Sequence, residues 1–115
     1  MKKSVFGLDE NIAGAISYLL AFLSGIIVLV MEKENKFVRF HALQSTIWFL
    51  IVSVLSWMVG LLTGIPILGL LFVFVQWALG IVIFISWLGL MVMAFQNKTF
   101  KIPVIGNVVW NQINK

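Results

Sequence analysis

Long apolar runs separated by short polar segments dominate this chain of 115 residues. The stretch from Ala42 to Asn97 contains no charged side chain, and a second uncharged run covers Ile12 to Met31. Twenty residues make about 30 Å of helix, which matches the hydrocarbon thickness of a bilayer. The pattern therefore predicts helices that cross a membrane.

Polar and helix-breaking residues divide these runs. The charged residues between positions 32 and 36 form a short hydrophilic turn, so the helices on either side of it should be antiparallel neighbours. Pro66 ends the second helix because it has no amide hydrogen and disfavours helix at Ile65. The last run, Ile67 to Phe95, would be about 43 Å long as one helix, so we expect its crossing part to begin near Phe74.

A short amphipathic helix is expected after the third span, because the apolar positions that follow Pro103 share one helical face. Its start, Ile102-Pro103-Val104-Ile105-Gly106, repeats the pattern of Ile65-Pro66-Ile67-Leu68-Gly69. The repeat indicates either a common way of starting a helix after proline or a duplicated unit.

The expected fold is therefore all-α and integral to the membrane, in one domain with three transmembrane helices. A helical hairpin and a third span precede the amphipathic interfacial helix. The expected spans are residues 12–31, 40–62 and 74–95, with interfacial segments at 66–73 and 103–114. For residues 67–73 two alternatives stay open, a re-entrant segment and the first part of the third span.

Composition supports a membrane protein and suggests an orientation. Hydrophobic residues make up 62% of the chain, charged residues only 10%, and the mean hydropathy is +1.10. The basic residues flank the apolar runs and form no stripe for nucleic acid. With three spans, six of the eight basic residues share a side, which predicts a plasma-membrane protein with its C-terminus in the cytoplasm and its N-terminus outside.

The lone histidine opens the second span and carries the main candidate site. His41, Gln44 and Ser45 fall on one helical face, which should turn away from lipid because buried polar groups need partners. Two interpretations stay open: a polar vestibule or proton-sensitive gate, and a hydrogen-bonded helix end. Arg39, on another face, is expected to reach the headgroups, and it completes the candidate polar cluster.

Two further sets of residues are candidates for function or packing. The secondary candidates are the polar residues before the first span and the one amide of the third: Asp9, Glu10, Asn11 and Gln76. Small residues recur every four positions in the first span, at Ala13, Ser17, Ala21 and Gly25. Such spacing favours close helix packing, either within one chain or between copies in a homo-oligomer.

The residues offer little for catalysis or metal binding. The acidic residues stand in two pairs, before and after a predicted span of about 30 Å, which separates them too far for a carboxylate dyad. No phosphate-binding loop is present, the chain has no cysteine, and one histidine supplies too few metal ligands. We therefore expect no enzyme activity, no metal and no cofactor.

Three blocks of the sequence resemble a known family. They are residues 7–11, Gly-Leu-Asp-Glu-Asn; residues 32–45, which end in Arg-Phe-His-Ala-Leu-Gln-Ser; and residues 100–106, Phe-Lys-Ile-Pro-Val-Ile-Gly. The chain resembles a family of small prokaryotic membrane proteins of unknown function, regarded as distant relatives of a chloroplast inner-envelope protein-import component. The resemblance implies an all-helical membrane protein, and the plant relative is linked to a translocation pore.

Two hypotheses about function follow. The first is an oligomeric pore or transport component, in which the His41 face lines a path for water. The second is a non-transporting partner that regulates or protects a membrane system. The expected partners are the lipid bilayer and either further copies of the chain or another membrane protein.

Overall fold

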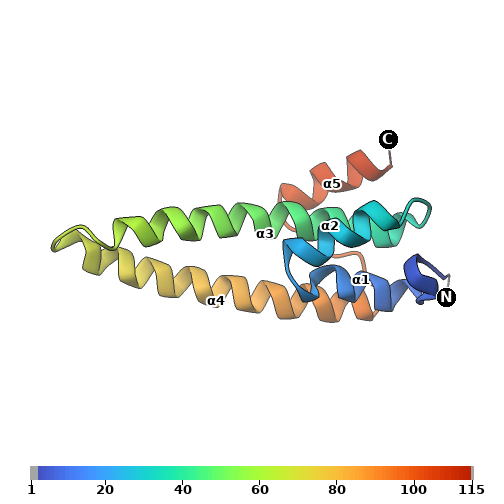
Figure 1. Cartoon of the computed structure of the whole chain (residues 1–115), viewed down its shortest axis with the longest axis horizontal. Coiled ribbons are helices and arrows are strands. Elements are labelled where there is room, and N and C mark those ends of the chain that lie inside the picture. The colour runs from blue at the N-terminus through green and yellow to red at the C-terminus, as the bar shows by residue number, and fades with distance from the viewer. Residues whose placement is uncertain (1–2, 115) are drawn as a thin grey trace.

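The computed structural model describes residues 3–114, and in that range the chain is helical (Figure 1). The elements are a short 3-10 helix η1 (Val5–Gly7), α1 (Glu10–Leu19), α2 (Phe22–Met31), α3 (Lys36–Leu62), α4 (Leu68–Phe95) and α5 (Ile105–Ile113). The described residues form no strand, which confirms the all-α prediction.

Helices α3 and α4 form an antiparallel pair, here called the long hairpin, along the molecule's 54 Å axis (Figure 1). Among the described residues, only these two helices are long and apolar enough to cross a membrane. The expected break near Pro66 is confirmed, since α3 ends at Leu62 and α4 begins at Leu68. The prediction of three spans is wrong.

The error lies in residues 12–31, because residues 10–31 form two helices of ten residues each with a two-residue turn between them. The chain reverses at Leu20 and Ala21, where Ala21 has a φ of 56° and a ψ of −130°. Side chains bond to the backbone of this turn: Ser24 Oγ accepts from the Leu20 amide, Ser45 Oγ donates to the Ala21 carbonyl, and Trp87 Nε1 donates to the Leu19 carbonyl. Helices α1 and α2 are therefore a second, short hairpin.

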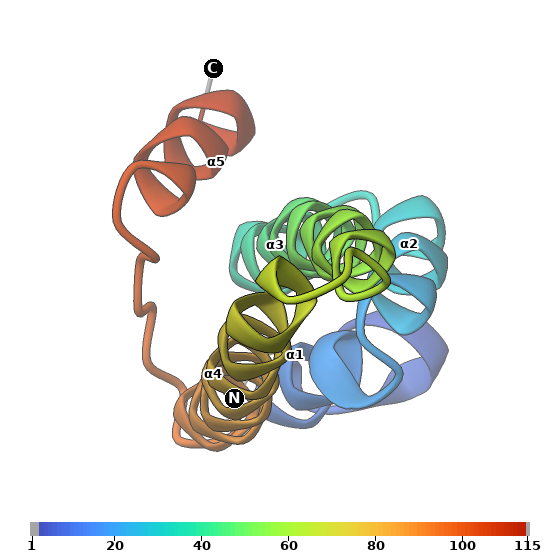
Figure 2. The same ribbon diagram turned by 90° about the vertical axis from the view of Figure 1, so that its left-hand side faces the viewer.

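The short hairpin packs against one end of the long hairpin (Figures 1 and 2). Tyr18 of α1 is buried with Phe49 of α3 and Leu90 of α4 in an apolar core. The side-chain amide of Asn11, at the start of α1, donates to the Phe95 carbonyl at the end of α4. The N-terminal and C-terminal segments thus lie at the same end of the molecule (Figure 1), whereas the side of a membrane on which each terminus lies stays a prediction.

The Ile-Pro repeat produces the same turn twice. Ile67 has φ 68° and ψ −61°, and Val104 has φ 69° and ψ −58°. In each turn the next amide bonds to the proline carbonyl, at 2.7 Å from Leu68 and 2.8 Å from Ile105. These are γ-turns with a central φ that L-residues seldom adopt. Both lead directly into a helix, so residues 68–73 are continuous with α4, which is one of the alternatives left open for this segment.

The predicted C-terminal helix is present as α5, within the expected residues 103–114. Its Val109 is fully buried, and the Trp110 ring lies 5.8 Å from the Phe40 ring of α3 in an edge-on arrangement. Residues 96–104, here called the α4–α5 linker, bring the chain back from α4 to α3.

Candidate functional site

The polar face of α3 points inward, as its spacing predicts. His41, Gln44 and Ser45 are each 0% exposed, although they lie within the first three turns of the helix. A buried polar group without a partner is costly in a membrane protein. The hydrogen bonds of these three side chains therefore decide what the site can do.

A side chain outside the predicted cluster, Tyr18 of α1, joins His41 to Gln44. The Tyr18 hydroxyl lies 2.7 Å from His41 Nδ1, and Gln44 Nε2 donates to the same hydroxyl at 2.9 Å. Tyr18 is itself 0% exposed. The sequence analysis missed this residue, and its signal is visible afterwards: it is the only tyrosine in an otherwise apolar run.

His41 and Gln44 also form hydrogen bonds to the backbone of the α4–α5 linker. His41 Nε2 lies 2.9 Å from the Lys98 carbonyl, and Gln44 Nε2 also donates to the Phe100 carbonyl at 3.0 Å. Gln44 Oε1 accepts from the Ile102 amide at 3.0 Å. Three backbone groups of the linker are thus fastened to α3, and we call His41, Gln44 and Tyr18 the clasp.

The clasp selects one form of the His41 ring. A carbonyl can only accept, so Nε2 must carry a proton, and the Tyr18 hydroxyl, which already accepts from Gln44, donates to Nδ1. We predict a neutral ring protonated on Nε2. In nitrogen NMR spectra of the labelled protein, Nδ1 should show the shift of an unprotonated nitrogen; a doubly protonated ring at neutral pH would contradict the assignment.

Ser45 and Arg39 form hydrogen bonds to backbone carbonyls of the short hairpin. Ser45 Oγ donates to the Ala21 carbonyl at the turn between α1 and α2. Arg39 Nη1 donates to the carbonyls of Glu32, at 2.6 Å, and of Leu29, at 3.3 Å. Because these carbonyls end α2, Arg39 caps that helix. The Nη1 group of Arg39 therefore faces the protein, and contact of this half-buried side chain with headgroups stays a prediction.

The secondary candidates at the start of α1 do not meet at one point. Asp9 pairs with Lys3 at 2.8 Å, and this ammonium lowers the pKa of the carboxyl below its usual value. Glu10 accepts from the Asn35 side chain at 3.0 Å, which links α1 to the start of α3. Asn11 bonds to the end of α4. The three residues contact three different parts of the chain, namely the N-terminal segment, the start of α3 and the end of α4, and they form no shared site.

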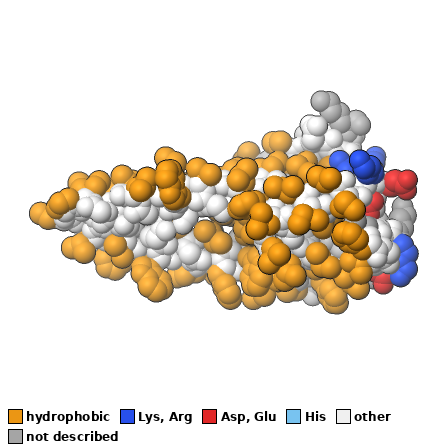
Figure 3. All heavy atoms as spheres, in the orientation of Figure 1, with side chains coloured by type: hydrophobic (Ala, Val, Ile, Leu, Met, Phe, Trp, Pro, Cys, Tyr) orange, Lys and Arg blue, Asp and Glu red, His pale blue; other side chains and the backbone are white. Residues whose placement is uncertain are grey.

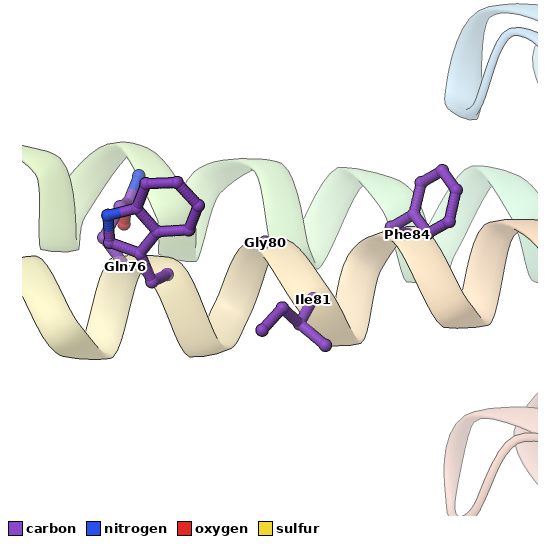
Figure 4. A pocket seen from close by; sticks show the side chains of 5 residues that line it. Gln76, Gly80, Ile81 and Phe84 are labelled. Carbon is purple, nitrogen blue, oxygen red and sulfur yellow. The ribbon is translucent and has the colours of Figure 1, made fainter.

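Gln76 lies two turns into α4 and donates to the Ser56 hydroxyl of α3 at 2.9 Å. It also borders a surface groove of about 360 Å³ on α4 (Figure 4). The other residues that line this groove are apolar or glycine: Trp77, Gly80, Ile81 and Phe84. The groove is suited to lipid chains and not to a path for water.

The small residues of the first apolar run pack within the chain. Ala13, Ser17 and Gly14 are buried on α1, and Gly25 is buried on α2. A Cβ placed on Gly14 would lie 3.1 Å from Phe37, and one placed on Gly25 would lie 2.9 Å from the Ala42 carbonyl. Ala21 stands at the turn, so the four predicted positions do not form one continuous stripe.

The arrangement lacks the parts of a metal centre in the range described. No group of three histidine, cysteine or acidic residues among residues 3–114 is placed to hold a metal ion. The polar atoms of the clasp face one another and the backbone. What they can do chemically is fix the positions of α1, α3 and the α4–α5 linker.

Comparison with known proteins gives the chain a family. Residues 8–109 match the family described as the magnetosome magnetite crystal formation protein family. The chain belongs to this family. A UPF0132 membrane protein from Archaeoglobus fulgidus is 45% identical over 106 residues, which cover 92% of this chain and 97% of the relative. A UPF0132 membrane protein from Methanocaldococcus jannaschii is 38% identical over 114 residues, covering 94% and 92%.

These family relatives are named as membrane proteins, and their names specify no activity. No solved structure matches the chain. The expected membership of a small membrane-protein family is thus confirmed. The matches do not include a chloroplast import component, so that part of the resemblance stays a prediction.

Proposed function

We propose that the protein is a non-transporting structural component of the plasma membrane that acts through its contacts with lipid and with other membrane proteins. The observation that carries the proposal is the closed clasp. His41, Gln44 and Ser45 were the residues expected to line a vestibule, yet each is 0% exposed and bonded within the chain. The proposal includes no enzyme activity.

The charge distribution supports one orientation. Charged residues gather at the end of the molecule that carries the short hairpin, here called the charged end (Figure 3). Its described basic residues are Lys3, Lys33, Lys36, Arg39, Lys98 and Lys101, whereas the turn between α3 and α4 has no charge. Basic residues favour the cytoplasmic side. We therefore place the charged end, with both terminal segments, in the cytoplasm.

The pore hypothesis is the second candidate, and it derives from the resemblance to the chloroplast import component. A pore would need polar residues of the spans to meet water. In the long hairpin, Gln76 bonds to Ser56 and Trp48 Nε1 donates to Ser86 Oγ at 3.0 Å, so these polar groups pair across α3 and α4. Such pairing favours the structural proposal. Self-association stays a prediction.

Single-cysteine labelling tests the proposal, since the chain has no native cysteine. Cysteines are placed one at a time along residues 37–56 and 67–95 and treated with a water-soluble maleimide in vesicles. We expect reaction only near the helix ends and at the turn, together with no ion flux above that of empty vesicles. Labelling at several consecutive positions deep in a span, together with ion flux, would support the pore and overturn the proposal.

A further inference from the structure

The short hairpin reaches between about a third and about half of the way along the long hairpin. Ten helical residues rise about 15 Å, which is half of a hydrocarbon core of about 30 Å. The turn of the short hairpin meets α4 at Trp87, eight residues before Phe95, where α4 ends. On α3 the same level is marked by Phe49, whose ring lies 6.4 Å from that of Tyr18. The short hairpin is therefore embedded on the charged side only.

Beyond this level only α3 and α4 continue, and their side chains are largely exposed. Leu55 and Trp57 of α3 are 44% and 67% exposed, and Phe74 and Trp77 of α4 are 74% and 72% exposed. The space-filling view shows a broad charged end that narrows toward the uncharged turn (Figure 3). The end-on view shows α1 and α2 beside the long hairpin, with α5 on its other flank (Figure 2).

The two halves of the molecule therefore need different areas of membrane. A helix with its side chains is about 10 Å wide, or roughly 80 Å² in cross-section. Four helices in one leaflet occupy roughly 160 Å² more than the two helices that continue into the other. Helix α5 adds to the difference, because it packs on α3 at the same charged end.

We infer that the protein is a wedge that favours curved membrane, in which the leaflet around the charged end is convex. In a flat bilayer the surplus cross-section crowds one leaflet, and curvature relieves that crowding. The partner is a lipid surface of a particular shape. The inference rests on the membrane insertion in the proposed function but not on the absence of transport.

The test uses orientation in vesicles of two sizes. Glu34 is exposed in the turn between α2 and α3, and Gly64 is exposed in the turn between α3 and α4. The single variants Glu34→Cys and Gly64→Cys are reconstituted by detergent removal into small sonicated and large extruded vesicles of the same neutral lipid. A membrane-impermeant maleimide then reports which end faces outward.

We expect the ratio of outward-facing to inward-facing Glu34→Cys to rise about twofold or more from large to small vesicles, because the outer leaflet of a small vesicle is strongly convex. The matched variant Gly64→Cys should change by a similar factor in the opposite direction. Equal fractions in both vesicle sizes would overturn the wedge and leave the proposed function intact.

A further variant separates a failed wedge from a failed topology. Ser4→Cys should label from the same side as Glu34→Cys in every preparation, since both lie at the charged end. Labelling from opposite sides would mean that residues 12–31 cross the whole bilayer, which would overturn the wedge and the proposed orientation. Ion flux with a preserved size effect would support the wedge and overturn only the non-transporting role.

Discussion

Replacing Gln44 with leucine is expected to lower the free energy of unfolding by about 2–4 kcal/mol. The change replaces the amide with an apolar side chain of similar volume and removes three hydrogen bonds, to Tyr18, to the Phe100 carbonyl and from the Ile102 amide. The Ile102 amide is then left buried without its partner. Because interhelical hydrogen bonds in membranes contribute less than their burial suggests, we expect a loss in the lower part of this range.

The loss is measured by titrating the protein in mixed micelles with a denaturing detergent and following helix content by circular dichroism. Ser53→Ala is the matched control, because Ser53 lies exposed on the same helix, and its effect should stay within about 0.5 kcal/mol. Trypsin should also cut the Gln44→Leu variant faster than the Ser53→Ala control at Lys98 and Lys101, which are exposed residues of the α4–α5 linker. Equal stability of the two variants would contradict the role of the clasp.

The long hairpin was predictable because its signals are local. An uncharged run far longer than one membrane crossing requires a turn, and Pro66 is the residue in it that cannot continue a helix. The inward face of α3 was equally accessible, since the 3.6-residue period alone brings His41, Gln44 and Ser45 together. These predictions needed no knowledge of the rest of the chain.

The short hairpin was not predictable in this way. Its turn contains no glycine or proline. Hydropathy depends on composition alone, so an apolar run of twenty residues has the same value whether it forms one span or two short helices that fold back on each other. The backbone of the turn is instead satisfied by Ser24, Ser45 and Trp87, and two of these are distant in sequence. The predicted number of spans depended on this one feature, and any orientation inferred from that number depends on it too, because each crossing reverses the side of every later segment.

The hydrogen-bond partners of His41 and Gln44 could not be predicted from the sequence for a related reason. Periodicity shows which face of α3 is polar, but the groups opposite that face come from Tyr18 and from the backbone of the α4–α5 linker. Backbone carbonyls carry no signature in the sequence. The inward face of α3 is hydrogen-bonded within the chain, which favours the proposed structural role, and the shape that these bonds maintain is the basis of the inferred wedge.

The close packing of the two hairpins predicts a second large effect, at Gly25 of α2. A Cβ at this position would lie 2.8 Å from Thr46 Oγ1 and 2.9 Å from the Ala42 carbonyl of α3. The carbonyl belongs to a helix backbone and cannot rotate away. We expect Gly25→Ala to force α2 away from α3 and to destabilise the protein by about 1–3 kcal/mol, even though alanine is the better helix former.

The matched control is Gly89→Ala on α4, where an added Cβ meets no atom within 4 Å. Its stability in the same denaturing titration should be unchanged within about 0.5 kcal/mol or slightly increased. Separation of α2 from α3 should also weaken the Ser45 bond to Ala21 and loosen the turn of the short hairpin. An Ala21→Cys probe should therefore react with maleimide faster in the Gly25→Ala background than in the Gly89→Ala background, and equal rates would contradict a rigidly docked short hairpin.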